Sequence, residues 1–168
     1  MPETFNQIFV PGNPKPAGSK TAYAIKKRDG SYVKRANGSL VINVTDASKQ
    51  AGKDWRKLVQ VYAKERWGAG PPTVNPLKLV THFRMQRPKS HFRTGQFAGM
   101  LKESAPYFHT SKPDALKLTR AIEDALTGII YKDDCQVVMH TIQKRYSHAG
   151  EEHGVVIAWH IDPLSFER

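Results

Sequence analysis

The chain has very little cysteine and no long apolar run. Cys135 is the only cysteine among 168 residues, so an internal disulfide is impossible and no zinc-ligand spacing is present. This composition suits a reduced setting, and we expect a cytoplasmic protein. No apolar stretch approaches the length that spans a bilayer, and residues 1–10 lack the basic start and apolar core of a signal peptide. We therefore expect no membrane partner.

Acidic side chains are also scarce relative to basic ones. The sequence has 26 Lys and Arg against 15 Asp and Glu, a formal net charge of +11. Such a balance favours an acidic polymer as partner, nucleic acid above all. A basic protein without a polyanionic partner is the alternative that charge alone leaves open. The length predicts one domain over residues 1–168, which is large enough for an apolar core without disulfides.

The order of apolar patterns predicts a single mixed α/β domain, a β-sheet with two main helices packed on it. We find no internal repeat. Asp46 is expected to cap the first helix and Gly68 to end it. The expected elements are a strand over 5–10, a hairpin meander over 21–44, a helix over 47–67, a strand over 76–86, a helix over 114–128, and strands over 137–146 and 154–161 joined as a hairpin through 147–153.

Two segments combine basic side chains with irregular or β-prone sequence. The meander contains two turn signals, Asp29-Gly30 and Asn37-Gly38, and its basic arms indicate either a charge-protected sheet edge or a ribbon that faces DNA. The segment 88–113 has no clear period and mixes basic with aromatic residues. This mixture suits a nucleic-acid contact, with a mobile surface insertion as the alternative.

Three aspartates flank the second predicted helix. Asp114 stands at its entrance, and Asp133 and Asp134 precede the next strand. A helix cap and ordinary turn residues are the simplest explanations of these positions. Carboxylates are also hard oxygen ligands that suit Mg²⁺ or Mn²⁺. Surrounded by lysines in a basic protein, they indicate a metal site that meets phosphodiesters.

The motifs around these aspartates resemble the RusA family of Holliday-junction resolvases. They are Lys-Pro-Asp at 112–114, Asp-Ala-Leu-Thr-Gly at 124–128 and Asp-Asp-Cys-Gln-Val at 133–137, and Pro-Gly-Asn-Pro-Lys-Pro at 11–16 is similar to the family's opening loop. The resemblance implies a small homodimeric α/β endodeoxyribonuclease, often encoded by phages or prophages. Such an enzyme uses Mg²⁺ or Mn²⁺ to cut paired strands at four-way DNA junctions.

The same resemblance assigns roles by position. Asp114 matches the first catalytic aspartate, Asp134 with its neighbour Asp133 matches the late one, and all three are expected metal ligands. Arg120 stands where the family has a functional lysine. Leu116 occupies the place of a second aspartate, on the side of the helix away from the apolar stripe. We therefore expect a weakened metal site, in which Asp133 or water fills in for the missing carboxylate.

Basic residues near these positions are expected to bind DNA by its phosphates rather than its sequence. If Leu116 abolishes cleavage, the chain is instead a catalytically impaired protein that binds branched DNA. A general single-strand or RNA-binding module is a third reading, which the aromatics disfavour because most of them fall on expected core faces. The expected DNA-binding residues are Lys15, Lys20, Arg87, Lys89, Arg93, Lys112, Lys117 and Lys132.

Overall fold

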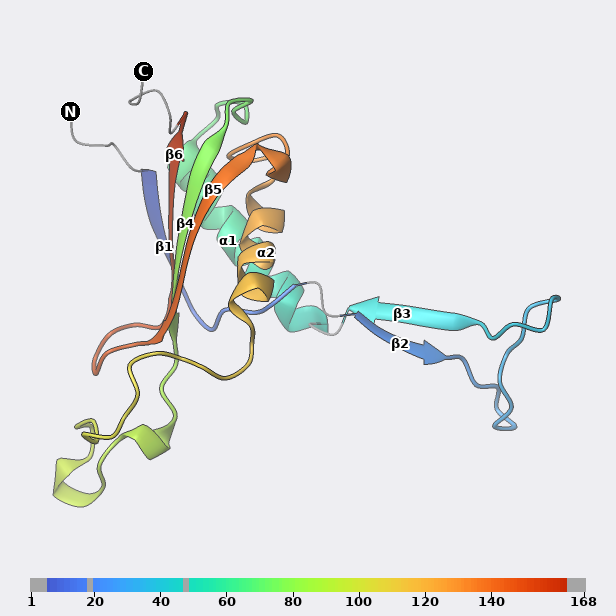
Figure 1. The fold of residues 1–168 in the computed structure, drawn as a ribbon, viewed down its shortest axis with the longest axis horizontal. Coiled ribbons are helices and arrows are strands. Elements are labelled where there is room, and N and C mark those ends of the chain that lie inside the picture. The colour runs from blue at the N-terminus through green and yellow to red at the C-terminus, as the bar shows by residue number, and fades with distance from the viewer. Residues whose placement is uncertain (1–5, 18–19, 47–48, 163–168) are drawn as a thin grey trace.

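The fold is that of a mixed α/β domain with a projecting ribbon (Figure 1). A computed structural model describes residues 6–17, 20–46 and 49–162, without the side chains of 20, 45, 46 and 49. Four strands form the main sheet in the order β1 (Asn6–Pro11), β6 (Gly154–Ile161), β4 (Leu77–Met85) and β5 (Val137–Tyr146). Helices α1 (Lys49–Trp67) and α2 (Ala115–Leu126) cover one face of this sheet. The predicted fold class is confirmed.

The pairing of the last two strands differs from the prediction. Their bounds agree with the expected 137–146 and 154–161, but β4 lies between β5 and β6, so the two strands do not form a hairpin. β4 pairs in parallel with β5 and antiparallel with β6. Every second residue of β4 from Leu77 to Met85 is buried. The alternating pattern packs one face of β4 on the core, and its parallel partner requires a long crossover, which residues 86–136 supply.

The core lies between the sheet and the two helices. Trp55, Val59 and Ala63 recur every four residues along α1 and are buried, so they form the helical stripe that the sequence indicates. Leu118 and Ile122 supply the matching stripe of α2, and both are fully buried. The core-facing side of the sheet contributes further buried residues, namely Leu77, Leu79, Phe83, Val155, Ile157 and Trp159.

The helix ends agree only in part with the expectation. Gly68 takes a φ of 79° and its N–H donates to the Lys64 carbonyl at 2.9 Å, which is the left-handed arrangement that ends a helix. Asp46, the expected cap of α1, is instead the last residue of β3. The predicted start of this helix at 47 lies outside the described residues, and α1 is described from Lys49.

The predicted meander is a two-stranded ribbon, β2 (Lys20–Ala24) with β3 (Ile42–Asp46). It extends away from the sheet and the helices, and the two predicted turns lie at its far end (Figure 1). We call residues 20–46 the arm. Along the described ranges of the chain, neither helix is both long and apolar enough to cross a bilayer.

Candidate functional site

A pocket forms where the end of β4 meets the start of α2. Its cavity volume is about 850 Å³, and three segments that are distant in the sequence supply its walls. It brings the expected catalytic Asp114 together with five of the expected DNA-binding residues. These five are Lys15, Arg87, Lys89, Lys112 and Lys117. We call it the basic pocket. Its lining residues are Asn13, Pro14, Lys15, Pro16, Met85, Gln86, Arg87, Pro88, Lys89, His109, Lys112, Pro113, Asp114 and Lys117.

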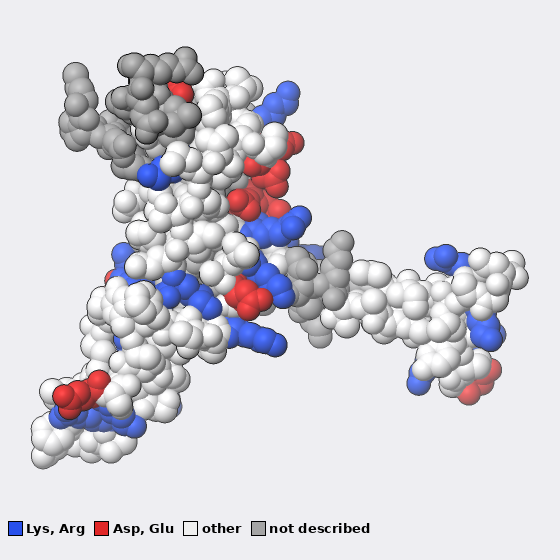
Figure 2. All heavy atoms as spheres, in the orientation of Figure 1, with Lys and Arg blue, Asp and Glu red and all other residues white. Residues whose placement is uncertain are grey.

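The position of the basic pocket in the fold favours an anionic ligand. It lies at the carboxyl end of β4, where the loops of α/β sheets commonly form binding sites. It also lies at the N-terminus of α2, where unpaired backbone N–H groups and the helix dipole attract negative charge. Figure 2 shows basic side chains around a small acidic group below α2, whereas acidic side chains gather over the upper part of the helix.

Asp114 occupies the N-cap position of α2 with an extended backbone, φ −67° and ψ 143°. Within the described residues, its side chain makes no hydrogen bond to the helix backbone. The carboxylate lies instead 3.4 Å from the Nζ of Lys117, and its side chain is 59% exposed. The simple capping explanation is therefore not realised here, and the carboxylate faces solvent beside a cation.

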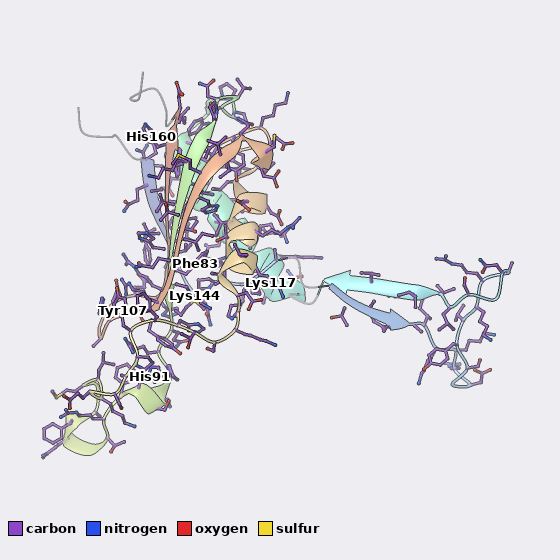
Figure 3. The ribbon with its side chains drawn as sticks, viewed as in Figure 1. Phe83, His91, Tyr107, Lys117, Lys144 and His160 are labelled. Carbon is purple, nitrogen blue, oxygen red and sulfur yellow. The ribbon has the colours of Figure 1, made fainter. Side chains whose placement is uncertain are left out.

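Lys144 is a residue of this site that the sequence analysis missed. It extends from β5 on the side of the sheet that faces the helices, and Figure 3 shows it at the same end of the domain as Lys117. Its Nζ donates to the Ser111 carbonyl at 2.8 Å and to the Pro113 carbonyl at 2.7 Å. Burial lowers the pKa of Lys144, and the charge of Asp114 partly opposes this shift. The ammonium group thereby fixes the chain that leads into Asp114.

Arg87 has a structural role in the described chain. Its Nε donates to the Ser147 carbonyl at 2.6 Å and its Nη1 to the Pro106 carbonyl at 2.9 Å. The guanidinium also lies over the Tyr146 ring, 5.2 Å from the centroid. These contacts tie the long segment after β4 to the end of β5. Two of its donors are thus already used, so Arg87 shapes the basic pocket more than it supplies a free cation.

His109 also lines the basic pocket. Its ring lies 4.7 Å from the Tyr146 ring, centroid to centroid. Burial lowers the pKa of His109, and the charge of Lys144 lowers it further. The lowered pKa favours the neutral imidazole, whose Nε2 lies 3.4 Å from the Ser111 hydroxyl oxygen. Its place five residues before Asp114 was the available signal.

The two adjacent aspartates, Asp133 and Asp134, lie at the other end of α2. Asp133 caps the short 3-10 turn η3 (Asp134–Gln136), and its carboxylate accepts a hydrogen bond from the Cys135 N–H at 3.0 Å. This hydrogen bond lowers the pKa of Asp133. Tyr131, just before this turn, donates to the Glu123 carbonyl in the last turns of α2. Asp133 thus serves as a cap, which the sequence left open as the ordinary explanation.

Asp114 and Asp134 are therefore separated by the length of a helix. α2 has 12 residues, and at 1.5 Å per residue it spans about 18 Å. Figure 1 shows η3 beyond the C-terminal end of α2, with Asp114 at the start of the helix. Across the residues that the structure describes, no three His, Cys, Asp or Glu side chains group to hold an ion. Within a single chain, the two carboxylates that were expected to bind the same metal ion are therefore far apart.

The other expected site residues lie outside the basic pocket. Leu116 is 74% exposed, which agrees with its predicted position away from the core. Arg120 is exposed on α2, and Lys132 is exposed beside η3. Arg93 is exposed in the segment after β4. Lys20 begins β2, but its side chain lies outside the described residues.

The fold and the basic pocket describe an α/β protein that presents a carboxylate among basic side chains, an arrangement that suits a nuclease. Comparison with known families matches residues 21–158 to the family described as Endodeoxyribonuclease RusA. The match covers more than half of the chain, which therefore belongs to the RusA family. Family membership implies an endonuclease that resolves Holliday junctions. A comparison with curated proteins finds no match.

Proposed function

We propose that this chain is a divalent-metal-dependent endonuclease that hydrolyses phosphodiesters at four-way DNA junctions, in the cytoplasm of a bacterial or phage-infected cell. The basic pocket is the observation that supports this most directly, because it places Asp114 beside Lys112 and Lys117 at a helix N-terminus. A DNA phosphate fits such a surface, since lysines and helix N-termini both bind phosphate oxygens.

The donors of the basic pocket fit Mg²⁺ or Mn²⁺ held together with a DNA phosphate. Mg²⁺ is commonly bound by one or two carboxylates, substrate phosphates and water, and Asp114 supplies one carboxylate that does not cap the helix. When bound, the ion polarises a phosphate oxygen and lowers the pKa of a water. With a single carboxylate from one chain, we expect weak ion binding in the absence of DNA.

The side chains of the basic pocket have separate tasks in this proposal. Lys117 lies 3.4 Å from the Asp114 carboxylate, so it neutralises charge that builds on a phosphate held there. Lys15 and Lys89 also line the pocket and bind neighbouring phosphates. Lys144 is a positioning residue, because its hydrogen bonds hold the Ser111 and Pro113 carbonyls.

We further propose that Asp134 acts in the same site as Asp114 only across a homodimer. In one chain the two carboxylates lie at opposite ends of a helix about 18 Å long, whereas metal–oxygen bonds are about 2.0–2.6 Å. Two copies of α2 that run antiparallel would bring the Asp134 end of one protomer to the Asp114 end of its partner.

Mixed dimers test this arrangement. Asp114→Asn and Asp134→Asn should each inactivate the homodimer. A dimer of one Asp114→Asn protomer with one Asp134→Asn protomer retains one intact composite site and should nick a synthetic junction in one strand. Sites built within single chains predict an inactive mixed dimer instead. Full activity of the Asp134→Asn homodimer would remove Asp134 from the site and leave the pocket proposal standing.

The second candidate function is a protein that binds branched DNA without cutting it. Leu116 favours this candidate, because an exposed leucine stands where the family pattern has an aspartate. Cleavage of a synthetic four-way junction with Mg²⁺ or Mn²⁺, measured beside a gel-shift titration, separates the two functions. Tight binding without cleavage at any ion concentration would support the binding protein. Cleavage that Asp114→Asn abolishes, with binding retained, would support the nuclease.

A further inference from the structure

The end of the arm is built from an eight-residue repeat that the sequence analysis overlooked. Residues 26–33 read Lys-Lys-Arg-Asp-Gly-Ser-Tyr-Val, and residues 34–41 read Lys-Arg-Ala-Asn-Gly-Ser-Leu-Val. Each copy forms the same turn, with glycine in the left-handed region at φ 85° for Gly30 and 80° for Gly38. The preceding Asp29 or Asn37 accepts hydrogen bonds from the backbone and hydroxyl groups of the serine that follows the glycine.

A closed set of backbone hydrogen bonds holds the two turns together. The Ile25 N–H donates to the Val41 carbonyl at 3.0 Å, Val41 to Val33 at 2.9 Å, and Val33 back to Ile25 at 2.9 Å. These three residues are spaced by eight, the length of the repeat. Because each residue bonds both others, the end of the arm has a defined shape, which a two-stranded ribbon alone does not ensure.

The ordered turns present a concentrated positive charge. Five exposed cations stand on residues 26–35, against one carboxylate, Asp29, which Ser31 already engages at 2.7 Å. Figure 2 shows these cationic atoms distributed over the far end of the arm, well away from the basic pocket. Like charges held close together repel one another, so a bound polyanion would stabilise this arrangement. The five cations are Lys26, Lys27, Arg28, Lys34 and Arg35.

We infer that the end of the arm binds the phosphate backbone of a duplex DNA arm, outside the part of the junction that enters the basic pocket. This inference rests on the proposed function for the identity of the partner as DNA. The regular ribbon from Lys20 to Ala24 has five residues and extends about 17 Å. The two turns lie beyond it, so they reach duplex that the basic pocket does not contact.

A competing occupant is a second copy of this chain. One face of the ribbon carries Ala22 and Ala24 opposite Val44 and Ile42, and these two larger residues are 55% and 47% exposed. This face is small and lies along the ribbon, whereas the cations lie at its end. A protein partner would cover the apolar face and be indifferent to the cations, so variants distinguish the two occupants.

The test compares two variants that each lose three cations. Every position is exposed, and glutamine retains the backbone groups that form the turns. Each neutralised phosphate contributes about 0.9 to the slope of log affinity against log salt. The arm variant should therefore lower this slope by about 3, and its affinity should fall about 40-fold less than that of the native protein between 50 and 200 mM salt. The arm variant is Lys27→Gln, Arg28→Gln, Arg35→Gln, and the control on α1 is Lys53→Gln, Lys57→Gln, Lys64→Gln.

Hydroxyl-radical footprinting adds a readout that a purely structural role would not change. The arm variant should lose protection of duplex phosphates away from the crossover while keeping protection at the crossover itself. An equal loss of salt dependence in arm and control variants, or no loss in either, would overturn the inference. So would unchanged DNA binding together with a lower sedimentation mass for Ile42→Ser, Val44→Ser, which would identify a second copy as the occupant.

The cleavage assay separates this inference from the proposed function. A native protein that never cuts junctions but shows arm-dependent footprints refutes the nuclease and leaves the arm as a DNA contact. A native protein that cuts junctions, with an arm variant that binds with the native affinity and salt dependence, refutes the arm contact alone.

Discussion

Replacing Leu116 with aspartate is the sharpest test of the proposed metal site at Asp114. Leu116 is 74% exposed, and α2 has no acidic residue in its first turn. A negative side chain there stabilises the helix by about 0.3–1 kcal/mol through its interaction with the helix dipole. This gain roughly offsets the lower helix propensity of aspartate, which costs at most about 0.7 kcal/mol. Because the substitution loses little buried apolar area, we expect the thermal midpoint to move by no more than about 2 °C.

The effect on the metal site should be much larger than the effect on stability. Position 116 follows Asp114 by two residues, so their α-carbons lie no more than about 7 Å apart. A unit charge 4 Å from another contributes about 1 kcal/mol in water and about 4 kcal/mol at an effective dielectric constant of 20. Since 1.4 kcal/mol is a factor of ten, Leu116→Asp should lower the Mg²⁺ or Mn²⁺ concentration for half-maximal cleavage about ten-fold or more.

Leu116→Asn is the matched control for Leu116→Asp, because asparagine has nearly the same shape as aspartate but carries no charge. The measurement is the junction-cleavage rate as a function of ion concentration, with the thermal midpoint recorded for each variant. If Leu116→Asp and Leu116→Asn give the same ion dependence while both remain folded, position 116 does not face the ion. The argument that this leucine weakens the site would then be refuted.

Three further predictions concern groups around the site and the sheet. Hydrogen bonds from Arg145 lower the pKa of Glu151 from 4.5 to about 2 in the folded protein. Because the folded pKa is below the unfolded one, the native protein should have its full stability advantage over Glu151→Gln above pH 4.5. Thermal melts should show that this advantage is lost as the pH falls toward 2. Lys144→Met should lower the cleavage rate about 100-fold by releasing the chain before Asp114, with Lys144→Arg restoring part of the rate; equal rates in Lys144→Met and native protein would exclude the positioning role. Asp133→Ala should lower the urea midpoint of unfolding by removing the η3 cap, and an unchanged midpoint would mean that the cap is dispensable.

Local sequence signals predicted the elements better than their arrangement. The bounds of β5 and β6 follow from alternation over 137–146 and 154–161, because side-chain period is a local property. The pairing of these strands does not follow from alternation, because a strand has the same alternating pattern whichever strand it pairs with. β4 separates these strands because its backbone pairs with β5 along one edge and with β6 along the other.

The candidate site shows the same division. Lys15, Lys89, Lys112 and Lys117 were predicted from charge and motif, and they line one pocket with Asp114. Lys144 could not be found this way, because a lysine in an alternating strand looks like an ordinary solvent-facing residue. Its role depends on the parallel pairing of β4 with β5, which directs the lysine toward the start of α2.

The sequence by itself determined the family, the element types and the excess of positive charge. These properties depend on residue identity and on short-range periodicity. Only the tertiary structure decided that Asp114 and Asp134 lie at opposite ends of α2. The physical reason is that a helix of 12 residues is a rigid spacer, and its length separates two carboxylates that the family resemblance assigns to one site.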